Sequence, residues 1–221
     1  MEWSPQDAME AYLDTLHHLS KGDCNGDDKA RVIEPRCMEL ISAMAAGKGS
    51  KRILEITTQG ITPLTIALAV AAKHTGGQLI CILPSDHRHS SSITKTKLHT
   101  ADLQRFIKVV YAGSTPCEDM KQITQLQLKK VDFAVIDSRF DDDYLKAVFR
   151  KLDGDVIKSG STLIVDDVDG VGRGWVWMLG QVLRKRRLES ATLPIGQGTE
   201  MTRVLGYSFK RRNRFLVTLH N

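Results

Sequence analysis

The pattern between residues 53 and 72 constrains the fold of this chain more than any other feature. A short apolar run ends at Glu55, the chain breaks at a turn around Gly60, and apolar residues then recur with helical spacing at Leu64, Ile66, Leu68 and Val70. A buried strand that feeds a helix through a tight turn is how open α/β sheets present backbone amides to nucleotide or nucleoside ligands. The turn Thr57-Thr58-Gln59-Gly60 has one glycine, where such loops usually have two or three.

Short apolar runs alternate with helical patterns through most of the chain. Strands are expected at residues 52–56, 78–83, 106–111, 133–137 and 162–166, with helices at 63–74, 91–101, 117–127 and 143–152. This alternation indicates a parallel sheet covered on both faces. The segments 189–195, 200–207 and 214–220 are separated only by turns, which predicts antiparallel strands at one sheet edge. We therefore predict an α/β fold with a doubly wound, mostly parallel sheet and antiparallel C-terminal strands.

Two helices are expected before this alternation begins. Ser4 and Pro5 form a helix start, and apolar residues follow at spacings of three and four, which predicts an amphipathic helix: Met9, Tyr12, Leu13, Leu16 and Leu19. A second helix is expected from about residue 34 to 46. We expect residues 1–50 to pack as a helical extension on a Rossmann-like domain at 51–221, with a single domain overall, because 221 residues suit one large α/β domain.

Composition excludes some classes of protein. No apolar run approaches the ~20 residues of a membrane span, and the acidic, amphipathic N-terminus is unlike a targeting peptide. The cytosol, or the cytosol and nucleus, is therefore the expected location. The cysteines lack a C-x-x-C pair and metal-ligand spacing, which indicates reduced thiols: Cys24, Cys37, Cys81 and Cys117.

The net charge of +5 arises largely from two basic clusters, at residues 184–187 and 210–214. Such clusters can attract nucleic acid or an anionic partner. The alternative is a solvated helix end and a hairpin loop. We do not expect a dedicated nucleic-acid role, because no aromatic residues that could stack on bases interleave with the charges.

Acidic residues end two neighbouring predicted strands. Asp137 ends the fourth strand, and Asp166 and Asp167 end the fifth. The carboxyl ends of parallel strands share one crevice, and adjacent strands lie about 5 Å apart, so these carboxylates should converge. Oxygen ligands of this kind suit Mg²⁺ or Ca²⁺. The alternative is that Asp166 and Asp167 cap the loop or pair with Arg173.

Four segments, in chain order, resemble the class I S-adenosylmethionine-dependent methyltransferases, and in particular the small cation-dependent O-methyltransferases of the catechol and caffeoyl-CoA kind. They are ILEITTQGITPLTIALA, VDFAVIDS, GSTLIVDDVDGVGRG and LPIGQGTEMTR, within about residues 35–203. The chain also resembles a plant family of uncharacterised methyltransferase-like proteins. That likeness is carried by the SP-x-x-A-x-x-AYL-x-T opening, ISAMAAG, and LAVAA-x-HTGG.

The resemblance implies a set of site residues. S-adenosylmethionine would be bound by Glu55, Gly60, Asp86, Gly113 and Ser114, and the divalent cation, Mg²⁺ or Ca²⁺, by Asp137, Asp166 and Asp167.

The sequence also departs from the family pattern at three places. Thr57 occupies the first glycine position of the cofactor turn, and Leu83-Pro84 stands where an acid should bind the ribose. No lysine follows Asp137 until Lys146, so we assign no catalytic residue.

Two functions follow from these features. The first is a methyltransferase that transfers the methyl group of S-adenosylmethionine to a small hydroxylated acceptor with cation assistance. The second is a catalytically inactive domain that serves as a binding or scaffold module, with an acidic or nucleic-acid partner for the basic clusters. The expected partners are a small-molecule acceptor and, as an oligomeric state to be considered, a second copy of the chain. No membrane partner is expected.

Overall fold

The computed structural model describes residues 2–21, 35–58, 60–83, 101–111, 130–137, 142–152, 156–166, 179–183, 186–193, 199–207 and 216–217. The chain forms two compact units, Met1–Tyr111 and Ala112–Asn221, which we describe one at a time. Within the described ranges, no helix is long and apolar enough to cross a membrane.

The first unit contains three parallel strands in the order β3-β2-β1. They are β1 (Arg52–Ile56), β2 (Gln78–Leu83) and β3 (Ile107–Tyr111). The backbone register places Glu55 opposite Cys81, and the apolar residues of β1 and β2 are buried. The bounds of β1 and β2 agree with those predicted from the apolar runs, and β3 begins one residue later than predicted.

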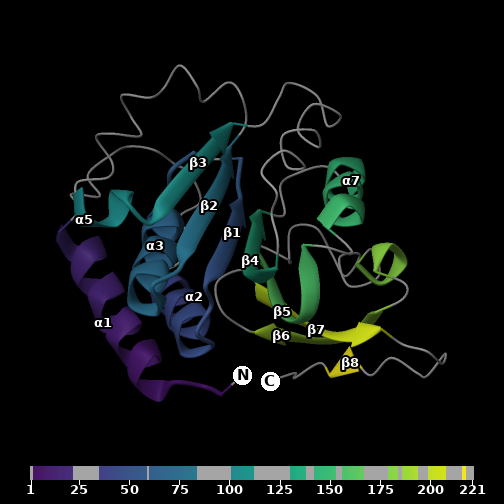
Figure 1. Cartoon of the computed structure of the whole chain (residues 1–221), viewed down its shortest axis with the longest axis horizontal. Coiled ribbons are helices and arrows are strands. Elements are labelled where there is room, and N and C mark those ends of the chain that lie inside the picture. The colour runs from purple at the N-terminus through teal and green to yellow at the C-terminus, as the bar shows by residue number, and fades with distance from the viewer. Residues whose placement is uncertain are drawn as a thin grey trace. The chain divides into compact units, whose positions relative to one another are not determined.

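Helices form two layers beside these strands (Figure 1). The central helix α3 (Pro63–Thr75) packs against β1 and β2, and α1 (Pro5–Lys21) and α2 (Pro35–Gly47) pack against α3 and each other. A short helix, α5 (Ala101–Gln104), contacts α3 as well. Ala101 is the only described residue of the helix predicted at 91–101. The helix predicted at 117–127 lies outside the described residues.

Local sequence explains where α3 begins and ends. Thr62 is the N-cap residue and forms a capping box with Thr65, with Pro63 in the first turn. At the other end Gly76 adopts the left-handed conformation with φ of 60°, which glycine tolerates without a steric penalty. The N–H of Gly77 then donates to the carbonyl of Ala72 at 2.8 Å. These contacts satisfy the polar groups that every helix end leaves open.

Small residues, not the large apolar ones, join α1 to the rest of the unit. Ala8, Ala11 and Thr15 are buried, and Thr15 Oγ1 donates to Ser42 Oγ of α2 at 3.0 Å. Four large apolar residues of the same helix are exposed, and we call them the α1 stripe: Met9, Tyr12, Leu13 and Leu16. The periodicity therefore predicts the helix correctly, but it does not identify the face that packs, because small side chains allow the helices to approach closely.

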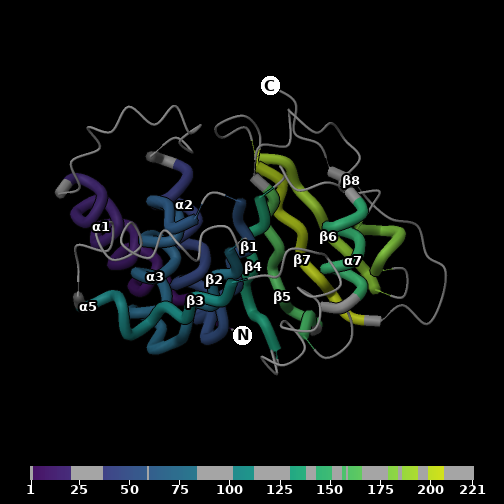
Figure 2. The backbone as a smooth tube through the Cα atoms, turned by 90° about the horizontal axis from the view of Figure 1, so that it is seen from above, coloured from purple at the N-terminus to yellow at the C-terminus, as the bar shows by residue number. Residues whose placement is uncertain are grey.

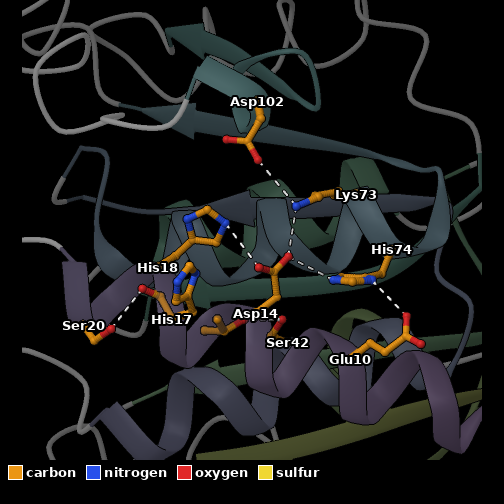
Figure 3. Close-up of polar contacts among 10 residues, drawn as sticks. Glu10, Asp14, His17, His18, Ser20, Ser42, Lys73, His74 and Asp102 are labelled. Carbon is orange, nitrogen blue, oxygen red and sulfur yellow. Dashed lines mark hydrogen bonds and ion pairs between the residues drawn. The ribbon is translucent and has the colours of Figure 1, made fainter.

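A polar cluster joins α1 to the end of α3 (Figure 3). Asp14 lies 3.0 Å from Lys73 Nζ, 3.1 Å from His74 Nε2 and 3.5 Å from His18 Nε2. Burial raises the pKa of Asp14, but the hydrogen bonds from Lys73 and His74 and the charges of Lys73 and His18 outweigh it, so the pKa lies below its usual value. We call these four residues the Asp14 cluster.

The second unit contains strands in the order β4-β5-β7-β6-β8. Their bounds are Val131–Asp137 (β4), Ile157–Asp166 (β5), Arg186–Leu193 (β6), Thr199–Tyr207 (β7) and Leu216–Val217 (β8). Strands β4 and β5 are parallel, while β7 lies between β5 and β6 and is antiparallel to both (Figure 2). Strand β8 pairs parallel to β6. The antiparallel pairing predicted for the C-terminal part is formed by β7 with β5 and β6, whereas the prediction was wrong for β8, which is parallel to β6.

Helix α7 (Asp142–Leu152) of the second unit has an apolar face that is buried, formed by Tyr144, Leu145, Val148 and Phe149. The first basic cluster is described only in part, because Arg184 and Lys185 lie outside the described residues. Arg186 and Arg187 belong to β6, and Arg186 is only 6% exposed. The second cluster, residues 210–214, lies outside the described residues.

We predict that Gly77→Ala destabilises the protein through a backbone clash. A Cβ atom at this position would lie 2.6 Å from the carbonyl oxygen of Lys51, and backbone cannot move aside as a side-chain end can. The free energy of unfolding should fall by about 2 kcal/mol or more, as for overpacked cores. Urea unfolding monitored by circular dichroism measures this.

The matched control is Gly49→Ala. Gly49 has φ of 67°, and no atom of the described residues lies within 4 Å of its added Cβ. This substitution should cost only the left-handed backbone penalty, about 1 kcal/mol. Equal losses at the two positions would contradict the packing argument.

Candidate functional site

A buried carboxylate stands at the carboxyl end of β1. The side chain of Glu55 is 1% exposed, and its Oε1 accepts a hydrogen bond from Thr65 Oγ1 at 3.0 Å. The Thr65 hydroxyl in turn accepts from the backbone N–H of Thr62 at 3.0 Å. The Glu55 side chain therefore links strand β1 to the first turn of α3. This link fixes both ends of the turn that connects them.

Cys81 lies beside this carboxylate, opposite Glu55 in the strand register. Burial raises the pKa of the Cys81 thiol well above its usual value, and the charge and hydrogen bonding of Glu55 raise it further. The thiol consequently stays protonated at neutral pH and behaves as a small apolar group. Cys37 and Cys81 are both free and buried, as predicted for reduced thiols, and Cys24 and Cys117 lie outside the described residues.

The turn after β1 changes direction at Gly60. Gly60 has φ of 80°, a left-handed conformation that explains the glycine at this position. Thr57 is 6% exposed, and its N–H donates to the carbonyl of Ile82 at 3.2 Å. Its amide thus continues the hydrogen bonding between β1 and β2 and is not directed at a ligand. Gly60 is itself buried and lies two residues before Thr62, the N-cap residue of α3.

The two aspartates predicted to converge lie at matching positions. Strands β4 and β5 are neighbours, and the register places the Cα of Asp137 opposite that of Asp166. Asp137 is half-buried at the strand end. Carboxylate oxygens at adjacent strand ends suit a hard divalent cation. Asp167 lies outside the described residues, and the described residues contain no group of three His, Cys, Asp or Glu side chains arranged to hold a metal.

Several predicted residues cannot be placed in this site. Asp86, Gly113 and Ser114 lie outside the described residues. Lys146 is on α7, where its Nζ forms an ion pair with Asp143 at 3.1 Å, and Asp143 is 94% exposed. This pair stabilises a helix surface and does not supply a base.

The sequence analysis missed a buried acid in the second unit. Glu200 of β7 is 2% exposed and lies opposite Val165 of β5 and Thr192 of β6. Thr202 Oγ1 donates to Glu200 Oε1 at 3.3 Å. Burial raises the pKa of Glu200 to about 7, although hydrogen bonds from Thr202 and Ser190 lower it. Glu200 therefore gains or loses a proton near neutral pH.

Three solved structures with a similar fold are methyltransferases. The chain is similar to SAH-bound methyltransferase PaMTH1 from Podospora anserina, with a TM-score of 0.60, 13% identity and coverage of 92% of this chain and 89% of that one. It is similar to an O-methyltransferase from Bacillus cereus in complex with SAH, with a TM-score of 0.60, 18% identity and coverage of 91% and 98%. It is also similar to the O-methyltransferase TomG from Streptomyces achromogenes in complex with SAM. The TM-score is 0.58, the identity is 16%, and the match covers 92% of this chain and 97% of that one.

These likenesses define the class of the chain as a protein with the class I methyltransferase fold, an α/β fold with mostly parallel strands and antiparallel pairing near the C-terminus. Residues 1–214 match the model of the family described as "Protein of unknown function (DUF1442)", and the chain belongs to that family. A search of curated proteins finds no significant match.

We predict that Glu200 makes stability depend on pH near neutrality. Its folded-state pKa of about 7 is raised above the ordinary value of 4.5, so the protonated form stabilises the fold. That contribution is complete below pH 4.5 and is lost as the pH rises to about 7. Wild type should therefore lose about 2 kcal/mol in free energy of unfolding, relative to Glu200→Gln, as the pH rises from 5 to 8.

Urea unfolding of wild type and variant at several pH values measures this difference. Glu189→Gln is the matched control, because Glu189 lies on the adjacent strand β6 and is exposed. Parallel stability curves for wild type and Glu200→Gln would contradict the prediction.

Proposed function

We propose that this chain is an S-adenosylmethionine-dependent methyltransferase that methylates a hydroxyl group of a small acceptor with the help of a divalent cation. The observation that carries the proposal is the buried Glu55 carboxylate, held by Thr65 at the start of α3 and followed by Gly60 in the left-handed conformation. In open α/β folds, ligands bind at this edge, outside the carboxyl ends of the strands.

Glu55 and Gly60 are the described residues that support cofactor binding at this turn. Gly60 has no side chain, whereas the first turn of α3 offers few amides, because Pro63 lacks an N–H and the N–H of Thr65 donates to Thr62 Oγ1 at 3.4 Å. The sequence resemblance adds Asp86, Gly113 and Ser114 to the proposed cofactor-binding set. Bound S-adenosylmethionine would supply a methyl group on a positively charged sulfur. The part of the chain is then to bind and orient the cofactor and the acceptor.

The cation is the less supported half of the proposal. Asp137 and Asp166 supply acidic residues at opposed backbone positions, with Asp167 next in the sequence. A divalent cation held there would lower the pKa of an acceptor hydroxyl. This would remove the need for the lysine that the sequence lacks after Asp137, and it is consistent with the ion pair that Lys146 forms with Asp143.

A binding module without catalytic activity is the second candidate. Thr57 favours it, because this residue stands where the related enzymes have a glycine, and its side chain is buried in the turn. A Cβ at this position narrows the space in which a cofactor could meet the backbone. Such a protein would retain the fold and one partner-binding surface without transferring a methyl group.

We expect the purified protein to bind S-adenosylmethionine, as measured by isothermal titration calorimetry with and without Mg²⁺. Glu55→Gln should weaken binding about tenfold or more, because it removes the charge that holds the turn. Thr57→Gly should strengthen binding, because it removes the crowding Cβ. Asp137→Ala should weaken binding only when Mg²⁺ is present, and the exposed Asp143→Asn serves as its control.

The outcomes distinguish the two candidates. No heat and no thermal stabilisation of wild type at millimolar S-adenosylmethionine would exclude the methyltransferase. Binding of the cofactor without methylation of any catechol or caffeoyl-type acceptor, by wild type or Thr57→Gly, would favour the binding module. An effect of Asp137→Ala that is the same without Mg²⁺ would remove the cation from the proposal.

A further inference from the structure

Both ring nitrogens of His74 face carboxylates of α1 (Figure 3). His74 Nε2 lies 3.1 Å from Asp14 Oδ2, and His74 Nδ1 lies 3.6 Å from Glu10 Oε2. An ionised carboxylate can only accept hydrogen bonds, whereas a neutral imidazole has a single N–H. One of the two contacts therefore lacks a proton when His74 is neutral, and both contacts are attractive when the ring carries its second proton.

Carboxylates outnumber permanent cations in and around the Asp14 cluster. The carboxylates are those of Glu10, Asp14 and Asp102, and the cation is Lys73, whose Nζ lies 3.0 Å from Asp14 and 3.4 Å from Asp102. Burial lowers the pKa of Lys73, but the hydrogen bonds and charges of Asp14 and Asp102 outweigh it, so this pKa lies above its ordinary value. Three negative charges therefore meet one positive charge, unless histidines supply the rest.

The position of His74 in α3 favours the same protonated form. His74 and Lys73 lie in the last turn of α3, where the open carbonyl groups of a helix attract positive charge. Lys51 Nζ donates to one of these carbonyls, that of Thr75, and its charge opposes a second proton on His74. The two carboxylates of α1 outweigh this cation, because both of them contact the ring directly.

His18 can supply a second proton to the same cluster. Its Nε2 lies 3.5 Å from Asp14 Oδ1, and its side chain is 10% exposed. The ring of His17 lies edge-on to that of His18, with 6.1 Å between the centroids. Because a charged His17 would repel a charged His18, we expect His18 to contribute less than His74.

Other charged residues lie on the elements that pack against α1 and α3. Glu55 of β1 binds at the opposite end of α3, and Arg52 lies at the exposed start of β1. Glu39 of α2 is buried, and its Oε2 has no hydrogen-bond partner among the described residues. Arg105, which follows α5, lies 4.7 Å over the ring of Phe106. The excess of acid around His74 is therefore set by α1 and α5.

We propose that protonation of His74, assisted by His18, controls how tightly α1 is held against α3, and that α1 is held more tightly as the pH falls from about 8 to about 6. Histidine is the side chain that ordinarily changes charge in this range, whereas aspartate and glutamate stay ionised. Above the range, Lys73 remains to hold Asp14. Below it, the two imidazolium groups add ion pairs with Glu10 and Asp14.

Loss of these ion pairs would release α1 locally, without unfolding the unit. The rest of the attachment consists of small buried residues, Ala8, Ala11 and Thr15, with one hydrogen bond from Thr15 to Ser42 of α2. Small side chains bury less apolar area than leucine or phenylalanine, so they stabilise the contact less. The helix and the surface of α2 and α3 beneath it would then exchange with solvent more readily at higher pH.

A metal ion explains the cluster less well than protons do. Histidine and carboxylate side chains are common metal ligands. The described residues, however, contain no group of three such side chains arranged to hold a metal. Asp14 is also contacted by the ammonium group of Lys73, which takes the place that a cation would need.

Amide hydrogen exchange of the full chain, measured by mass spectrometry at several pH values, tests the proposal. Protection of α1, corrected for the chemical exchange rate at each pH, should be about fivefold greater at pH 6 than at pH 8, because partly exposed ion pairs each contribute a factor of roughly two to five. Protection of residues 67–72 of α3, which are interior, should change less.

Substitutions identify the group that takes up the proton. His74→Gln retains a side-chain N–H but does not titrate, so it should remove most of the pH dependence of α1. His17→Gln is the matched control, because His17 is exposed on α1. Glu10→Gln leaves one acid facing the ring and should reduce the dependence. Circular dichroism confirms that each variant is folded.

Nuclear magnetic resonance of the His74 ring nitrogens locates the pH at which this residue loses its proton, which should coincide with the midpoint of the change in α1. The proposal is overturned if protection of α1 does not depend on pH, or if α3 changes by the same factor. It is also overturned if His74→Gln and His17→Gln keep equal pH dependence. Glu200→Gln, in the second unit, should leave the dependence of α1 unchanged, and its loss in that variant would likewise overturn the proposal.

Discussion

The contact between Glu55 and Thr65 is the interaction on which the first unit depends. A carboxylate in the interior is costly unless hydrogen bonds replace water, and here the 3.0 Å bond from Thr65 supplies one of them. The same hydroxyl belongs to the capping box that begins α3. Strand β1, the turn and the central helix are consequently positioned by one side chain, and any ligand bound at Gly60 meets a backbone whose conformation is already set.

Helix α3 serves different purposes at its two ends. Its N-terminal end follows the candidate cofactor turn, whereas its C-terminal end contributes Lys73 and His74 to the Asp14 cluster. Residues 4–15, 41–47 and 68–77 contact one another through Thr15 with Ser42, Ser4 with Gly47, and Asp14 with Lys73 and His74. These three segments therefore include the contacts that attach α1 to α2 and α3.

The sequence predicts where helices and strands begin and end better than it predicts which face of an element packs against its neighbours. The apolar runs of β1 and β2 and the Thr62-Pro63 and Gly76-Gly77 pairs around α3 each have one local cause, so their bounds could be inferred. Periodicity could not identify the packed face of α1, since that face consists of alanine and threonine.

The same limit applies to the candidate site. A single acid such as Glu200 in a strand gives no signal, because its raised pKa depends on burial by β5 and β6. The opposition of Asp137 and Asp166 was predictable, because parallel strands end together. A complete ligand set was not, because it depends on loops after those strands.

Burial of α3 on nearly all sides has a consequence for local opening of the structure. Its side chains from Ala67 to Ala72 are all buried, and it is flanked by β1, β2, α1 and α2. In a hierarchy of partial unfolding, such an interior helix opens last, whereas α1, attached by small residues and a polar cluster, can separate at a lower free energy. Slow amide exchange would then belong to the helix behind the cofactor turn, and faster exchange to the helix that faces solvent.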